Sequence, residues 1–275
     1  MEKQSSSKVM LTRKEAEEYC TYKRQKKISE IMSAFRRSES ELTAYDSAVR
    51  LGEQALRLRQ AAVRMTPVDL LARGEEVCKN GMVDCIVGGN GETLISVKVY
   101  ETKKAVKLGV KEITLRLTPS FIDNGRYTEL RKEMKSVKRV AKKAIVKARV
   151  EKVYPQATLE RLIRIASEVG FAYFSLPYFS GCERLQTVCK GGCLLEVSGI
   201  DNLSVFKEMA GGGIGRMLVK GAWDMYNEWL KEVENITVEQ EEVLPLSSKD
   251  EEKGVPLLLP PTKDATLQDE GEKTL

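Results

Sequence analysis

The sequence predicts an α/β fold, a closed (β/α)8 barrel with N-terminal helices and a disordered acidic C-terminal tail. From residue 83 to residue 233, short apolar segments alternate with amphipathic ones, which is typical of parallel strands joined by helices. The chain has 275 residues, enough for one barrel of about 250 residues. The number of strand–helix units favours a closed barrel over an open, doubly wound sheet.

The region before residue 83 is expected to be mostly helical. Residues 1–10 are polar, and we expect them to be disordered. Three helices are predicted to follow, over residues 12–35, over Glu41–Arg64, and from Pro67 to about Gly81. The second of these depends on Leu51, Ala55 and Leu58, which recur at helical spacing.

The alternating region supplies the strands of the predicted sheet. Strands are expected at Val83–Val87, Glu112–Leu117, Ile145–Val150, Phe171–Leu176, Cys193–Val197 and Gly215–Val219. The helices between and after them are expected at 94–108, Arg126–Lys142, Thr158–Val169, Cys182–Cys189, Ser204–Met209 and Ala222–Val233. Because the early strands are hard to recognise, a barrel that lacks one strand or has a degraded first strand is left open as an alternative.

The composition changes near residue 234, so we divide the chain into residues 1–10, a barrel over 11–233, and a tail over 234–275. The tail is acidic, rich in proline and poor in aromatic residues, and such a segment buries too little apolar surface to fold. Within it, residues 255–261 form an apolar island, VPLLLPP. This island is either a short docking motif for a protein partner or a linker without a role.

Several kinds of site are excluded by composition. The chain has no histidine, which rules out Ser-His-Asp and Cys-His catalysis and the common zinc hydrolase sites. The six cysteines are scattered without zinc-ligand spacing, so we expect no metal site and reduced thiols in a cytoplasmic protein. No apolar run is long enough to predict a membrane span.

The net charge of +5 is unevenly distributed. Residues 232–275 hold twelve acidic and four basic side chains, so the rest of the chain is strongly basic. A basic body with an acidic tail is compatible with nucleic-acid binding. We favour the simpler interpretation, in which lysines solvate the outer helix faces.

One stretch, residues 91–130, carries a specific pattern. It contains Gly91, Thr93, Lys98, Glu101, Ala105, Val106, Gly109, Glu112, Ile113, Gly125 and Tyr127. At this spacing the stretch resembles deoxyribose-phosphate aldolase, a class I aldolase on a TIM barrel. The resemblance covers roughly residues 38–230. It implies a Schiff-base lysine, a second lysine that lowers the pKa of the first, a proton-relay aspartate, phosphate-binding loops, and no cofactor.

The positions that would carry this chemistry are substituted. Ser175 occupies the position of the Schiff-base lysine, and a serine cannot form an imine. Glu196 stands at the position of the second lysine, with the charge reversed, and Thr114 replaces the relay aspartate. Of the phosphate-binding positions, Gly199, Lys220 and Gly221 remain as candidates for a small phosphorylated ligand.

Lys147 matches a lysine of the family pattern. Lys147 and Arg149 lie two residues apart on a predicted strand and therefore share one face. If that face is the lumen, the neighbouring cation would lower the pKa of Lys147. The opposing interpretation is that Lys147 only pairs with Glu151 or Glu196.

Three functional classes follow. The favoured hypothesis is a catalytically inactive barrel that binds a ligand. The alternative is a lyase acting on a sugar phosphate, either as a deoxyribose-phosphate aldolase or through Lys147. A third is an interaction protein that uses its basic helices and its tail. The oligomeric state does not follow from the sequence.

Overall fold

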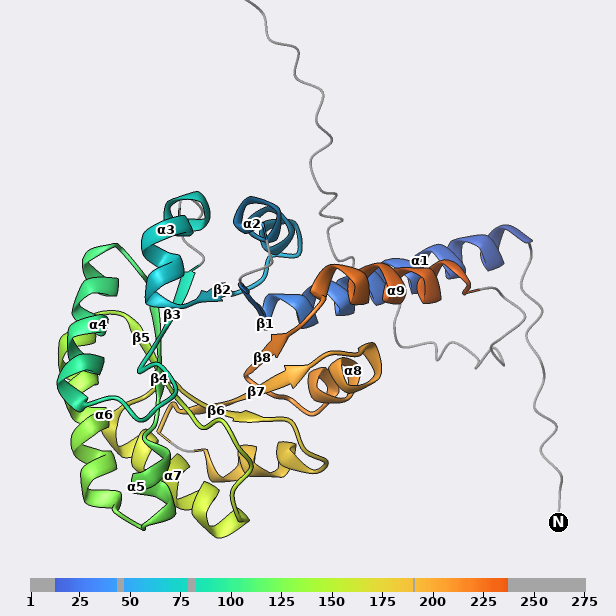
Figure 1. Ribbon diagram of the computed structural model, residues 1–275. Helices are drawn as coiled ribbons and strands as arrows, with labels where there is room; N and C mark the ends of the chain where they lie inside the picture. The colour runs from blue at the N-terminus through green and yellow to red at the C-terminus, as the bar shows by residue number, and fades with distance from the viewer. Residues whose placement is uncertain (1–12, 44–46, 79–82, 190, 237–275) are drawn as a thin grey trace, which may run out of the picture.

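Eight parallel strands close into a barrel at the centre of the protein (Figure 1). The computed structural model describes residues 13–43, 47–78, 83–189 and 191–236. The strands follow one another in chain order, and β8 pairs with β1 to close the sheet. They are β1 (Ser38–Glu41), β2 (Ala62–Met65), β3 (Val83–Val87), β4 (Glu112–Arg116), β5 (Ile145–Arg149), β6 (Tyr173–Pro177), β7 (Leu194–Ile200) and β8 (Arg216–Val219).

Helices surround this barrel and connect its strands (Figure 1). They are α1 (Arg13–Arg36), α2 (Ala48–Arg57), α3 (Pro67–Cys78), α4 (Ile95–Lys107), α5 (Pro119–Asp123), α6 (Tyr127–Ala141), α7 (Gln156–Val169), the 3-10 helix η1 (Cys182–Val188), α8 (Leu203–Gly211) and α9 (Ala222–Glu234). This (β/α)8 TIM barrel confirms the predicted fold class. No helix in the described part of the chain is both long and apolar enough to span a membrane.

The helix predicted over Glu41–Arg64 is wrong. This segment contains the end of β1, the shorter helix α2 and the strand β2. The alternative of a barrel with one strand missing does not hold, because β1 and β2 are both present in the closed sheet. β1 has the sequence SESE and β2 the sequence AVRM, and in both the residues that face the barrel interior are charged. Without an apolar alternation, such four-residue strands cannot be recognised from the sequence.

From residue 83 onward, the strand predictions agree with the structure to within two or three residues. The short helix expected at 182–189 is present as the 3-10 helix η1. The helix predicted from Pro67 is described as far as Cys78, and its predicted end near Gly81 lies outside the described residues. The expectations for residues 1–10, for the tail from residue 237 and for the island at 255–261 lie outside the described residues.

Successive residues of each strand alternate between the helix layer outside the barrel and the lumen inside it. On β5, Val146 and Ala148 are fully buried against the helix layer. Lys147, between them, contacts carboxylates on β1, β3, β4 and β7, which is possible only inside the barrel. Two layers therefore form, an apolar one between sheet and helices and a charged one in the lumen.

Candidate active site in the barrel lumen and mouth

Seven charged side chains fill the lumen. Four are carboxylates and three are cations, and no side chain of the set is more than 10% exposed. The set, which we call the lumen cluster, consists of Glu39, Asp84, Glu112, Glu196, Arg64, Lys147 and Arg216. Burying this many charges is costly unless each is paired, so the pairing determines which protonation states persist.

Lys147 lies at the centre of the lumen cluster. Its Nζ contacts Glu39 and lies 2.7 Å from Glu112 and 3.3 Å from both Asp84 and Glu196. Burial by itself lowers the pKa of Lys147, but the surrounding carboxylates outweigh burial and raise it well above the ordinary value for lysine. Lys147 is therefore a caged ammonium ion.

The expected effect of Arg149 on Lys147 is thus wrong. Both side chains face the lumen, as the spacing predicted, but Arg149 pairs with Glu151 nearer the mouth. Glu151 also pairs with Arg116, and among the described residues no ion pair joins it to Lys147. The predicted pairing of Lys147 with Glu196 is present, at 3.3 Å.

Two arginines complete the pairing of the cluster. Arg64 donates to Asp84 at 2.6 Å, to Glu196 at 2.7 Å and to Glu39 at 2.9 Å. Arg216 donates to Glu39 at 2.7 Å and also reaches Glu112. Burial raises the pKa of Glu196, but Arg64 and Lys147 reverse this effect and hold it well below its usual range.

Glu39 differs from Asp84 and Glu196 in the direction of its pKa shift. Burial is the largest effect and raises the pKa of Glu39 to about 8, although Lys147 and Arg64 oppose the rise. For Asp84, the same two cations outweigh burial and lower the pKa. With four carboxylates and three cations in the cluster, one proton on Glu39 makes the lumen electrically neutral.

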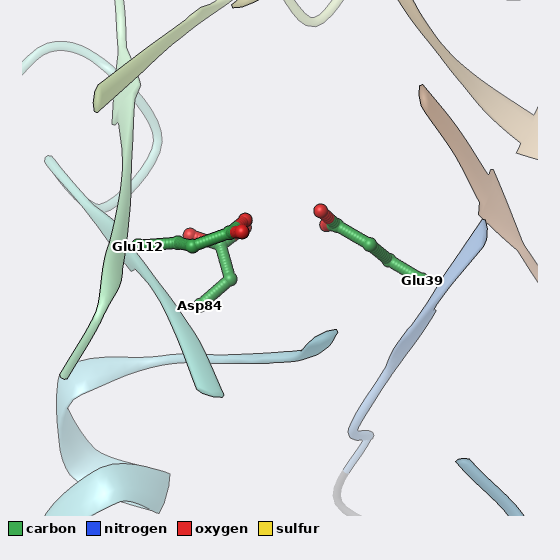
Figure 2. A group of neighbouring side chains, drawn as sticks. All are labelled: Glu39, Asp84 and Glu112. Carbon is green, nitrogen blue, oxygen red and sulfur yellow. The ribbon is translucent and has the colours of Figure 1, made fainter. Parts of the chain in front are cut away.

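Three carboxylates of the lumen cluster are arranged like the ligands of a metal ion. Glu39 reaches from one side of the barrel toward Asp84 and Glu112 on the other (Figure 2), and one oxygen of each lies within 4.8 Å of the other two. Such an oxygen set suits a hard cation. The ammonium group of Lys147 contacts all three carboxylates, so the protein supplies this cation itself.

The two other substituted family positions also lie in the lumen. Thr114 donates its hydroxyl hydrogen to Asp84 Oδ2 at 2.7 Å and so supports the cluster. Ser175 is fully buried on β6, paired in register with Arg149 on one side and Glu196 on the other. No amine occupies the place where the resemblance implies a Schiff base.

A cavity of about 410 Å³ opens above the cluster, at the C-terminal ends of the strands. Gly199 and Lys220, two of the predicted phosphate-binding residues, line it together with Arg149 and Ser198. Gly221, the third, caps the start of α9 in a left-handed conformation and lines a neighbouring cavity. The structure thus brings the three candidates together at the mouth.

A second buried ion pair supports this end of the barrel from outside. Lys98 on α4 contacts Glu133 on α6, and both side chains are fully buried. The ammonium group of Lys98 also donates to the carbonyl oxygens of Gly91 and Arg116 and to Thr118 Oγ1. This pair therefore ties the loops that follow β3 and β4 to the helix layer.

The chain is similar to known aldolases in sequence and in fold. No model of a protein family matches the sequence. A deoxyribose-phosphate aldolase from Metamycoplasma hominis is 27% identical over 175 residues, which cover 58% of this chain and 79% of that protein. The chain is similar in sequence to this aldolase, as the motifs between residues 91 and 130 indicated.

Solved structures share the fold. QR15, an aldolase, superimposes with a TM-score of 0.65 and 22% identity over 73% of this chain and 96% of its own. A deoxyribose phosphate aldolase from Aeropyrum pernix, described as a unique tetrameric structure, gives a TM-score of 0.62 and 16% identity over 78% and 97%. The barrel is therefore an aldolase-like TIM barrel.

Proposed function

We propose that the protein binds a small phosphorylated ligand at the mouth of an aldolase-like barrel and does not form a Schiff base with it. The observation that carries this proposal is the cage around Lys147. Imine formation requires a neutral amine. Four carboxylates around Lys147 favour its protonated form instead, and the pKa shift has the opposite sign to the one that catalysis needs.

The residues at the mouth of the barrel support the proposal that a phosphorylated ligand binds there. Lys220 follows β8 and Gly199 lies at the end of β7, and both line the 410 Å³ cavity. The first N–H groups of a helix have no partner within the helix and favour an anion, and α9 begins beside Lys220. Arg116 and Arg149 share the carboxylate of Glu151, so with Lys220 the mouth holds three cations against Glu151 and Glu41.

A second candidate function is aldolase or lyase activity through Lys147. The match to an aldolase sequence favours it, and so does the position of Lys147 inside the lumen. This function would require the ammonium group to lose its proton while surrounded by carboxylates. Ser175 cannot substitute for it, because a hydroxyl group does not form an imine.

Two measurements on purified protein test the proposal. An aldehyde-release assay with 2-deoxyribose 5-phosphate should show no turnover above background, and borohydride in the presence of the sugar phosphate should trap no adduct. Turnover near about 1 per second, or an adduct on Lys147, would support the second function instead.

Binding is tested by calorimetry with ribose 5-phosphate. We expect Lys220→Met to weaken binding, because it removes the cation at the mouth. Lys103→Met, which changes an exposed lysine on α4, serves as the matched control and should leave binding unchanged. Equal affinities of both variants and the unmodified protein would argue against a phosphate site at Lys220.

A further inference from the structure

A second cavity, of about 540 Å³, adjoins the mouth on the outer side of β1 and β8. We call it the side cavity, and its walls come mainly from α2 and from the first turn of α9. The mouth cavity and the side cavity share four lining residues, Glu41, Thr43, Val219 and Lys220. Each volume is within the range of small-molecule sites, about 300–1,000 Å³. A ligand with its phosphate at Lys220 can therefore extend into the side cavity.

The wall formed by α9 is aromatic. Trp223, in the first turn of α9, lines the side cavity and is half-buried. Its ring lies 5.7 Å from that of Tyr226, centroid to centroid, at an interplanar angle of 35°. This contact fixes the orientation of Trp223, because aromatic pairs at such separations attract each other. The side cavity thus has a flat, positioned ring beside the cation of Lys220.

The wall formed by α2 is polar. Arg50 and Gln54 lie one helical turn apart and both line the side cavity. Among the residues that the structure describes, no carboxylate is paired with the guanidinium group of Arg50. A carboxamide such as that of Gln54 both donates and accepts hydrogen bonds, and a guanidinium group stacks on planar rings. These groups suit the edge and face of a heteroaromatic ring.

We infer that the ligand is a nucleoside monophosphate, with its phosphate beside Lys220 and its base in the side cavity against Trp223. This inference rests on the phosphate site proposed above and deepens it. A sugar phosphate alone would fill the mouth but would leave the side cavity, with Trp223 and Gln54, without a partner. A base has a flat face for Trp223 and a polar edge for Gln54, and stacking of this kind tolerates any base.

Calorimetry with the full chain tests the inference, using ribose 5-phosphate and adenosine 5′-monophosphate as probes at one salt concentration. We expect the nucleotide to bind about 5- to 100-fold more tightly, the range that one base–aromatic stack supplies. Trp223→Leu should reduce nucleotide affinity to the level of ribose 5-phosphate without changing the affinity for ribose 5-phosphate. Lys220→Met should weaken both probes, and Trp223→Phe should keep most of the difference between them.

The outcomes separate the inference from the proposed function. If both probes bind equally well, or if Trp223→Leu weakens both by the same factor, the ligand is not a nucleotide, although the phosphate site stands. If neither probe binds at millimolar concentration, both proposals are wrong. Arg57→Met, on the exposed part of α2, is the control for nonspecific charge effects and should change neither affinity. A thermal melt of each variant checks that the fold persists.

Discussion

Removal of the ammonium group of Lys147 would test whether the lumen cluster depends on it. Lys147→Met keeps most of the side-chain volume and removes the charge. The carboxyl groups of the lumen cluster would then face only Arg64 and Arg216 in the buried interior of the barrel. Breaking a buried ion pair from one side typically costs about 3–5 kcal/mol. Since Nζ contacts four carboxylates, we expect a loss of free energy of unfolding in this range or above it.

Urea unfolding at pH 7, followed by tryptophan fluorescence, measures this loss. For a domain of this size, a loss of about 3–5 kcal/mol lowers the melting temperature by about 6–20 °C. Adding Glu196→Gln to the variant removes one ionised carboxylate beside the lost ammonium group and should restore part of the stability. Lys143→Met, which changes an exposed lysine before β5, is the matched control and should lie within about 0.5 kcal/mol of the unmodified protein. A loss below about 1 kcal/mol for Lys147→Met would refute the caged ammonium ion.

Two further predictions concern buried charges. The folded pKa of Glu39 is about 8, above its ordinary value of 4.5, so the folded state holds the extra proton and this group's contribution to stability falls as pH rises from about 5 to 8. Glu39→Gln should flatten the pH dependence of urea unfolding between pH 5 and 8, and an unchanged slope would contradict the assignment. Lys98→Met leaves Glu133 buried without its cation and should cost about 3–5 kcal/mol. Hydrogen exchange should also become faster around Gly91 and Thr118, whereas Lys103→Met should leave both quantities unchanged.

The limits of the sequence prediction follow from the lumen cluster. Strands β3 to β8 could be recognised because their outward residues, such as Val146 and Ala148, are apolar and regularly spaced. β1 and β2 are short, and their inward residues Glu39 and Arg64 are charged. The charged inward residues that form the lumen cluster therefore also made these two strands hard to recognise from the sequence.

The same limitation affected the candidate site. The position of Lys147 in the lumen followed from the family pattern and the alternation of the strand. Of its partners only Glu196 was predicted, because Glu39 and Arg64 belong to the strands that were not recognised, and Asp84 lies in a strand assigned for its apolar character. An aspartate at the second position of an otherwise apolar strand, VDCIV, is a sequence signal that could have indicated a further buried charge partner.

Glu196 connects the proposed absence of Schiff-base chemistry to the cage around Lys147. The resemblance implies a lysine at this position, where its charge would lower the pKa of a neighbouring amine. With glutamate there, the carboxylate lies 3.3 Å from Lys147 Nζ and 2.7 Å from Arg64. One reversed charge thus removes the group that would lower the amine's pKa and adds one that raises it. Restoring a lysine at Ser175 alone would therefore place a new amine beside Glu196, which would hold it in its protonated form.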